Sequence, residues 1–464
     1  MATSVIRRDL IHEKLEKSIY LVLMGILLTG YLYLLFIGAE IDSIPAVLWI
    51  LRIITAVMAI HIGRLWNDKG FMLLACYLGY SFFRLFLTNP QGTMSQYASE
   101  YLLSGLWFCT GCYGLARILK KQELKRFLSL ITAILITGIT IYCLIGLYVA
   151  FTDQEIPSLC SGSWHLYSGR LALIYLPTTS GGLLGIFSLI TLIAMLCTQA
   201  KNGKVLYFLA YLIILLTLAL TDSRTAFCSL AGGNSIITGV VLSKTVIQKG
   251  KRFPVIQWTA AVLTILAVVA FSLFGLRYLV PVFNKVKMQK GLLFPSAMAE
   301  ATTSAKTELT NQYYLVNGSL YLSGRKEIWQ IAVGELKNNP RIILFGKSLL
   351  QPLIDNPWIC QYAHCHNIML QIVMENGLVG CLPLGLFLIM VLIRSICMIK
   401  DRKETLWLRF LPALIAAIWI GEMAECYTWF RSSQCPTGAF LFVIMGIVSF
   451  YSNEDSNTRI DISL

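Results

Sequence analysis

Charged residues are scarce in this sequence. Only 13% of its 464 residues are Asp, Glu, Lys or Arg, whereas 56% are hydrophobic and the mean hydropathy is +0.69. A soluble domain carries about 25% charged residues, and a soluble chain this apolar could not cover its surface with polar groups. The scarcity excludes a cytosolic enzyme, a nucleic-acid-binding protein and a secreted disulfide scaffold. It predicts a polytopic membrane protein.

Signals for cleavage and lipid attachment are also missing. The first apolar run, residues 19–37, has no clean small-x-small cleavage site and is longer than the usual signal-peptide core of about 7–15 residues. We therefore expect a retained first membrane helix. Neither a myristoylated glycine nor a prenylated cysteine is expected. Most of the 13 cysteines lie inside apolar runs and indicate small buried side chains, although the sequence leaves open whether Cys360 pairs with Cys365 or Cys426 with Cys435.

Long apolar runs recur along the whole chain. Because a membrane helix needs about 20 apolar residues, we predict an all-α polytopic membrane protein with about twelve transmembrane helices. The expected spans lie near residues 19–37, 44–62, 70–88, 98–117, 127–151, 180–198, 204–221, 226–243, 257–276, 368–396, 406–426 and 437–451.

The positions of Lys and Arg predict the topology. Basic residues cluster in alternate loops, and cytoplasmic loops of membrane proteins carry the excess of positive charge. The clusters include Arg7, Arg8, Lys14, Lys17, Arg64, Lys69, Arg117, Lys120, Lys121, Lys125, Arg126, Lys201, Lys204, Lys244, Lys249, Lys251, Arg252, Arg394, Lys400, Arg402, Lys403 and Arg459. We therefore expect both termini in the cytoplasm. This pattern also accounts for most of the net charge of +14.

The expected organisation has five parts. Residues 1–18 and 452–464 form cytoplasmic tails, residues 19–276 hold nine transmembrane helices, and residues 366–451 hold the last three. Residues 277–365 between them form one long extracytoplasmic loop, and such a loop is usually functional.

Within that loop the sequence predicts one clear helix. Residues 325–338 place Ile328, Ala332 and Leu336 at helical spacing, which is typical of an amphipathic helix. Residues 340–360 contain four Pro or Gly residues and predict a turn-rich loop.

Few arginines lie on the expected exterior side, and three of them stand beside apolar runs. Arg170 lies in LYSGRLALIYLP, Arg224 in LALTDSRTAF and Arg325 in YLSGRKEIW. Charge near hydrocarbon is costly and needs a partner or a purpose. Asp222 could pair with Arg224, and Arg325 could simply be solvated, although a cation opposes the dipole at a helix start. Three guanidinium groups on one face favour a bound anion, since Arg binds phosphate in a bidentate manner.

A histidine stands where the long loop is expected to enter the membrane. His366-Asn367 is followed by nine residues, then Gly377, two more residues and Gly380. A histidine here could act as a general base because imidazole titrates near neutral pH. It could equally cap a helix or lie at the membrane interface.

Two other patterns near this histidine point to weaker candidates. Residues 360–366 contain two Cys and two His, but their spacing fits no standard zinc pattern, so no metal is expected. The FGKS sequence at residues 345–348 resembles a phosphate-binding loop but lacks its first glycine, because that position is Arg341.

Two carboxylates lie near the exterior end of the eleventh expected span. Glu422 and Glu425 are followed by Arg431, and intramembrane carboxylates are functional candidates by default. Pairing with Arg431, or with Arg52 or Arg84 in other spans, is the simpler interpretation. A role in orienting other groups is the alternative.

Together these motifs resemble a known family. The segments LTDSRTAF, SGRKEIWQIAVGELKNNPRIILFGKS and HNIMLQIVMENGLVG are similar, in sequence and in order, to those of the O-antigen ligase and O-antigen polymerase superfamily of bacterial membrane glycosyltransferases. The last segment fits the ligase pattern H-N-x9-G-x-x-G. The resemblance covers about residues 160–400. Lys347 departs from it, since relatives often carry a second Gly there.

The resemblance implies a GT-C-like, metal-independent enzyme with no cofactor. Its donor would be an undecaprenyl-pyrophosphate-linked glycan, and its acceptor the hydroxyl of a glycan or glycolipid at the exterior face of the bacterial inner membrane. Arg224 and Arg325, with Arg170 less securely matched, would bind the pyrophosphate, and His366 would help the hydroxyl attack. Asn367, Asp222, Glu422 and Glu425 are candidate supporting residues beside this set.

The motifs do not separate polymerase from ligase, and of the two we favour polymerase. A flippase or transporter of lipid-linked oligosaccharide is the competing class, to which about twelve spans and the embedded Arg52 and Arg84 would also be suited. A third class is a non-catalytic assembly subunit. The long exterior loop with its Arg and His motifs favours the enzyme, because transport does not need them. We find no internal repeat, which further weakens the transporter interpretation.

Overall fold

The computed structural model describes most of the chain. The described residues are 2–37, 46–88, 96–152, 154–157, 163–167, 170–173, 177–248, 254–272, 325–348, 365–401, 404–423 and 436–451. The following statements on structure concern these residues. Apart from one small sheet, their regular structure is helical.

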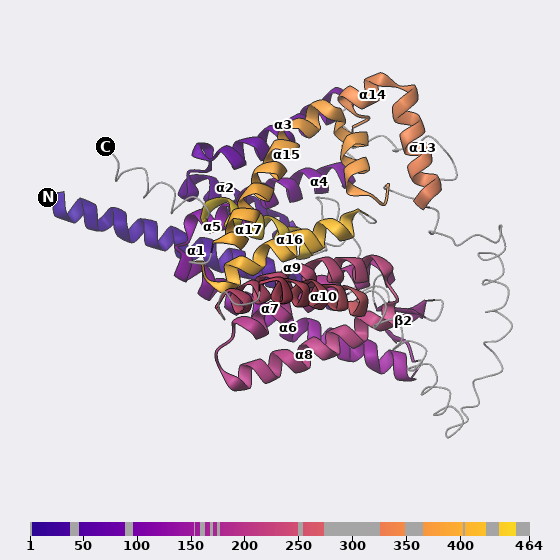
Figure 1. Cartoon of the computed structure of the whole chain (residues 1–464). Helices are drawn as coiled ribbons and strands as arrows, with labels where there is room; N and C mark the ends of the chain where they lie inside the picture. Colours follow the sequence, from indigo (N-terminus) through magenta and orange to yellow (C-terminus); the bar gives the residue numbers. More distant parts are fainter. Residues whose placement is uncertain are drawn as a thin grey trace.

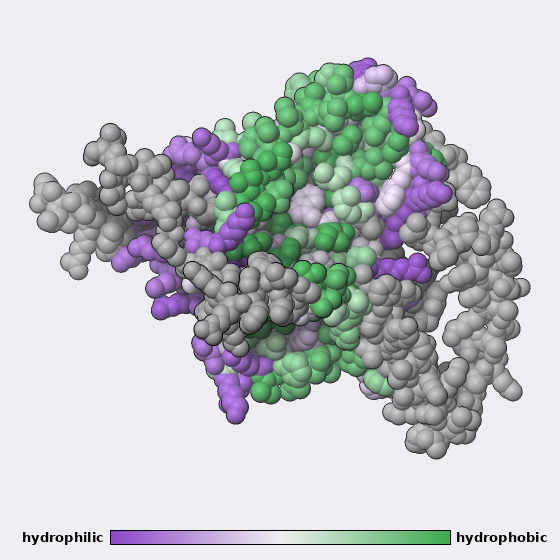
Figure 2. All heavy atoms as spheres, in the orientation of Figure 1, coloured by the Kyte–Doolittle hydropathy of each residue, from purple (hydrophilic) through white to green (hydrophobic). Residues whose placement is uncertain are grey.

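Eight helices are long and apolar enough to cross a membrane, so the chain is a multi-pass membrane protein. Figure 2 shows the consequence at the surface, where a hydrophobic band lies between hydrophilic residues on two opposite sides. The eight are α1 (Ala2–Ile37), α2 (Ala46–Gly63), α3 (Lys69–Thr88), α6 (Lys121–Thr152), α7 (Pro177–Cys197), α8 (Lys201–Thr221), α9 (Arg224–Gln248) and α15 (Ile368–Lys400).

The other expected spans are helical but shorter. They correspond to α4 (Gln96–Trp107) continuing through η3 (Phe108–Cys112) into α5 (Tyr113–Ile118), and to α10 (Pro254–Ala270), α16 (Leu406–Glu422) and α17 (Pro436–Tyr451). The total of twelve transmembrane helices therefore stays a prediction.

A small antiparallel sheet follows α6. Its strands are β1 (Ile156–Pro157), β2 (Ser163–Tyr167) and β3 (Arg170–Leu173), in the order β1-β2-β3. Leu173 of β3 packs against Gly146 of α6, and Trp164 of β2 is buried beside Tyr142. The sheet thus covers one end of α6.

The long loop contains the predicted amphipathic helix. Helix α13 runs from Arg325 to Asn338, the expected bounds, and buries Ile328 and Ala332. The expected turn-rich stretch begins differently, since residues 340–345 form the short helix α14 (Pro340–Phe345) with Pro340 at its first position, where proline is favoured. Residues 349–360 of that stretch lie outside the described part.

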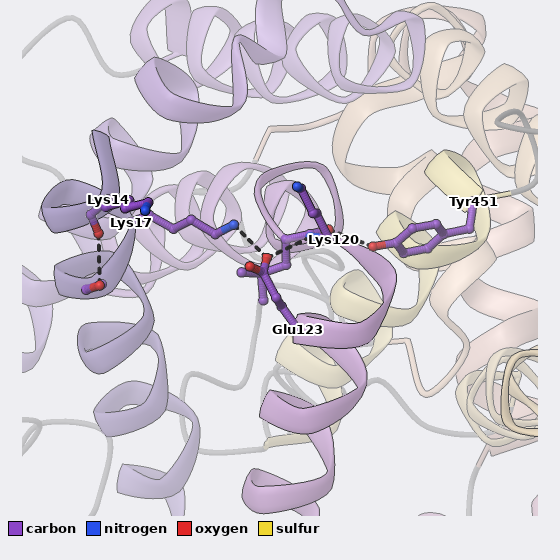
Figure 3. A network of polar contacts seen from close by, with 7 residues as sticks. Lys14, Lys17, Lys120, Glu123 and Tyr451 are labelled. Carbon is purple, nitrogen blue, oxygen red and sulfur yellow. Dashed lines mark hydrogen bonds and ion pairs between the residues drawn. The ribbon is translucent and has the colours of Figure 1, made fainter. Parts of the chain in front are cut away.

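Polar contacts join several helices at the end of the bundle opposite to α13. Lys17 of α1 pairs with Glu123 of α6 at 2.6 Å, and the Tyr451 hydroxyl of α17 donates to the Leu119 carbonyl at 2.6 Å (Figure 3). Lys121 pairs with Glu404 at 2.5 Å. These contacts bring the basic clusters of distant segments to one end of the molecule.

Helices α9 and α16 run antiparallel and fix where the other end lies. Arg409 of α16 donates to the Ser243 hydroxyl of α9 at 3.3 Å, whereas Ile420 near the end of α16 packs against Gly232 nearer the start of α9. The start of α9 and the end of α16 therefore share one end of the bundle. Because Asn367 bonds to Met423 just after α16, the start of α15 lies there too. We call this the His366 end; in Figure 1 it is the side toward α13.

Candidate functional site

His366 lies in a tight turn directly before α15. Its φ of 49° is in the left-handed region, which a residue with a side chain rarely adopts. Asn367 then caps the helix, because its Oδ1 accepts from the Leu370 N–H at 3.0 Å. Its Nδ2 donates to the Met423 carbonyl at 3.0 Å. The histidine is thus half-buried at a position fixed by two helices.

The peptide groups just before His366 are held on both sides. The Trp329 indole of α13 donates to the Cys365 carbonyl at 2.9 Å, and the Cys365 N–H donates to Gln371 Oε1 at 2.8 Å. Cys365 itself is fully buried. Contacts from α13, α15 and α16 therefore converge on Cys365 and Asn367, the residues on either side of His366.

Gln371 also donates a hydrogen bond to a buried carboxylate, that of Glu375. Its Nε2 donates to Glu375 Oε1 at 2.5 Å, and each of the two side chains is 1% exposed. They stand four residues apart, which places them on the same face of α15.

Helix α15 bends just beyond this pair, where two glycine backbones meet. Gly377 interrupts the helix with a φ of 62°, and Gly346 after α14 has a φ of 73°. The Lys347 N–H donates to the Met374 carbonyl at 2.7 Å, and the Ser348 N–H donates to the Glu375 carbonyl at 2.9 Å. A Cβ on Gly377 would lie 2.4 Å from the Leu344 carbonyl oxygen, so the contact requires glycine. The FGKS segment is thus a docking element for α15.

Helix α3 supports the same contact from the other side. Arg84 donates to the Gly346 carbonyl at 2.8 Å, Thr88 donates to the Ser348 hydroxyl at 2.8 Å, and Ser81 donates to Asn376 Oδ1 at 2.7 Å. Arg84 therefore binds the backbone of the docking element.

The side chain of Lys347 forms an ion pair with Glu335 of α13. The residue that departs from the family pattern thus ties α13 to the docking element.

Arg325 is the first residue of α13 and half-buried. Trp329 stands one turn further along the same face and bonds to the residue before His366. The structure therefore brings the start of α13 close to the histidine turn.

Arg224 is the first residue of α9 and exposed. A two-residue turn precedes it, with Asp222 at a φ of 43° ending α8 and the Ser223 hydroxyl accepting from the Ala226 N–H at 3.4 Å. The flanking hydroxyl residues Thr221, Ser223 and Thr225 are buried. The antiparallel packing of α9 and α16 places this turn at the His366 end.

Arg170 is the first residue of β3, and α7 begins four positions after the last residue of that strand. The first turns of α7 touch the Arg224 turn, since a Cβ on Gly181 would lie 2.3 Å from the Ser223 Cβ. The backbone of Arg170 is paired with Tyr167 in the sheet.

The remaining candidates are distributed as follows. Glu422, at the end of α16, is 1% exposed and lies beside Met423, the partner of Asn367. Glu425 lies outside the described residues, as do Cys360 and His364 of the metal pattern and three of the four cysteines considered for disulfides. Arg52 lies over the Trp49 and Trp107 rings at 4.5 and 5.2 Å. Among the described residues, no three His, Cys, Asp or Glu side chains gather as a metal site would require.

Sequence reasoning missed Trp329, Gln371 and Glu375 as parts of the site. The spacing held a signal for the last two, because a polar pair four residues apart inside an apolar run predicts one polar helix face. Trp329 stood beside the apolar positions of the predicted helix, and its partner is a backbone carbonyl, which no side-chain pattern reveals.

In a comparison with known families, residues 209–385 match the family model described as O-antigen ligase. That segment contains Arg224, Arg325, His366 and both glycines of the docking contact. No curated protein matches the chain.

Proposed function

From the O-antigen ligase family domain at residues 209–385, we propose that the chain is a membrane glycosyltransferase. It moves a glycan from an undecaprenyl-pyrophosphate-linked donor to an acceptor sugar hydroxyl at the extracytoplasmic face. The observation that carries the proposal is the histidine turn, on which α13, α15 and α16 converge through Trp329, Gln371 and Asn367. Transport does not require a histidine whose two neighbours are both fixed by hydrogen bonds.

The reaction is a displacement at the anomeric carbon of the donor sugar. The acceptor oxygen forms a bond to that carbon while the bond from carbon to the pyrophosphate oxygen breaks, and the electron pair leaves with undecaprenyl pyrophosphate. His366 takes the hydroxyl proton or orients the hydroxyl for attack. The donor already carries the energy for transfer, so no nucleotide takes part in this step.

The charge that develops on the leaving pyrophosphate needs stabilisation. Arg224 and Arg325 are the first residues of α9 and α13, so each adds a guanidinium group to the positive end of a helix dipole. Such ends bind phosphate readily, and fixed positive groups aimed at developing charge lower the barrier. Arg170 is a further candidate at the same end.

Replacing the histidine tests the enzyme proposal. We expect His366→Ala to lower glycan transfer by about 100-fold or more, while the protein accumulates normally in the membrane. The matched control is His61→Ala, which is expected to leave transfer unchanged because His61 is exposed at the end of α2. Normal surface polysaccharide in the His366→Ala strain would contradict the proposal.

The lipid-linked intermediates of a deletion strain distinguish the activities. Single lipid-linked repeat units accumulating at the outer face indicate a polymerase, and long lipid-linked polymer indicates a ligase. Intermediates that stay at the inner face indicate a flippase and would overturn the proposal.

A further inference from the structure

A buried amide and a buried carboxylate lie one turn into α15, where an apolar pair would be cheaper. Gln371 and Glu375 are each 1% exposed, and their neighbours Ile368 and Ile372 are also buried. Burying a carboxylate without good partners is costly, particularly within a membrane helix. The reason for burying this polar pair must therefore lie in the hydrogen bonds that it makes.

The hydrogen bonds fix the orientation of the Gln371 amide. Glu375 accepts through its Oε1, so the Gln371 amino group must face it, and the amide oxygen must face the Cys365 N–H. A rotated amide would place two acceptors together at one end and two donors at the other. The pair thus holds the Cys365 peptide in a single direction.

That direction determines the histidine turn. A left-handed φ costs about 1–2 kcal/mol for a residue with a side chain, so His366 keeps its φ of 49° only where neighbouring contacts enforce it. The Cys365 N–H is held by Gln371 and the Cys365 carbonyl by Trp329. Removing the Gln371 contact frees the peptide group on the N-terminal side of Cys365, while Trp329 still holds the one that joins Cys365 to His366.

The same pair continues to the docking element. The Glu375 carbonyl accepts from the Ser348 N–H, and Ser348 contacts Thr88 of α3. Hydrogen bonds therefore lead from α3 through Ser348 to the backbone of Glu375, and from the Glu375 side chain through Gln371 to the residue before His366.

We propose that Gln371 and Glu375 are positioning residues, which hold the imidazole of His366 at the acceptor hydroxyl without touching either substrate. This inference rests on the proposed function of His366. Because misplacing a reacting group lowers the rate of the chemical step more than it weakens binding, loss of the pair lowers kcat and leaves the KM for the donor nearly unchanged.

The test exchanges the two side chains in the full-length protein in detergent. The donor is the lipid-linked glycan extracted from the deletion strain, and release of undecaprenyl pyrophosphate is measured. Gln371→Glu alone sets two carboxylates against each other, so we expect kcat to fall about 10-fold or more. The double variant Gln371→Glu, Glu375→Gln can rebuild both hydrogen bonds: the bond between the two side chains reverses its direction, and the Cys365 N–H still donates to an oxygen of residue 371. It is expected to recover kcat to within about 3-fold.

Truncation provides the second arm. We expect Gln371→Leu to lower kcat about 10-fold or more with the donor KM within about 2-fold of the original. Gln330→Leu is the matched control, because Gln330 is an exposed residue of α13 outside this network, and it is expected to leave both constants unchanged.

The outcomes separate this inference from the proposed function. If His366→Ala is inactive while Gln371→Leu and Gln371→Glu keep the original kcat, the positioning role is wrong and the proposed function stands. If His366→Ala is active, the proposed function itself is wrong. Should Gln371→Leu not accumulate, the exchange pair decides, since a double variant that accumulates without recovering kcat also overturns the inference.

Discussion

Arginine side chains at the His366 end occupy helix starts, where the helix dipole makes a positive charge unfavourable. Arg224 is exposed at the first position of α9, and a cation at a helix start loses about 0.3–1 kcal/mol to the dipole. The few arginines on the expected exterior side and the family resemblance predict that Arg224 binds the pyrophosphate. That prediction is consistent with its position, because a bound anion would offset the unfavourable interaction with the dipole.

Replacing Arg224 is therefore expected to separate stability from activity. Arg224→Ala should lower transfer about 100-fold, since it removes a fixed positive group from the leaving pyrophosphate. The melting temperature without substrate should stay the same or rise slightly, because an unfavourable charge is gone. Transfer rates and thermal unfolding of the purified protein measure the two effects.

The matched control is Arg341→Ala, which removes an exposed arginine of α14. It should change neither activity nor melting temperature. A loss of activity in Arg224→Ala that is fully explained by unfolding would contradict the assignment.

Asn367 has two separable roles, because each atom of its amide has a different partner. Asn367→Asp keeps the oxygen that caps α15 but loses the donor to Met423, whereas Asn367→Ala loses both. We expect Asn367→Ala to destabilise the helix start by about 1 kcal/mol and Asn367→Asp to be milder. If both variants unfold at the same temperature, the cap contributes nothing beyond the link to α16.

At the scale of elements, the contact between the α14 turn and the α15 kink holds the site together. It joins residues about 30 positions apart through backbone atoms, and Lys347 connects it to α13. A Gly377→Ala variant meets both a φ of 62° and a Cβ only 2.4 Å from the Leu344 carbonyl oxygen. The contact must therefore open.

We expect Gly377→Ala to destabilise the protein by about 2 kcal/mol or more and to abolish transfer. Gly385→Ala on the same helix is the matched control, because nothing lies within 4 Å of a Cβ there. Accumulation, melting temperature and surface polysaccharide measure the difference. Equal behaviour of the two variants would show that the glycine contact is dispensable.

The same elements show which features were predictable. The bounds of α13 follow from apolar residues at helical spacing, a local property of the sequence. The docking of FGKS was not predictable, because its partners are the carbonyls of Met374 and Glu375, and backbone groups carry no residue signature. The sheet at residues 156–173 was missed for a related reason, since its strands have two to five residues each, too few for a clear alternation.

At the scale of the molecule, charge is distributed unequally between the two ends. The end with the Lys17–Glu123 and Lys121–Glu404 pairs also carries Arg64, Arg117 and Lys204. The eight apolar helices place these two ends on opposite sides of a hydrophobic band. They do not determine which of the two sides is cytoplasmic. The excess of basic residues predicts that the Lys17 end is cytoplasmic and that the His366 end faces the exterior.

A labelling experiment in intact cells decides this orientation. The exposed residues Gln330 and Lys204 lie at opposite ends, and each is replaced in turn by one additional cysteine. A membrane-impermeant maleimide should modify Gln330→Cys above the background of the native cysteines. Lys204→Cys should react only after the cells are permeabilised. The reverse pattern would place His366 on the cytoplasmic side, where the exterior transfer reaction proposed for it could not occur. The same measurement therefore tests both the orientation of the whole molecule and the proposed chemistry of His366.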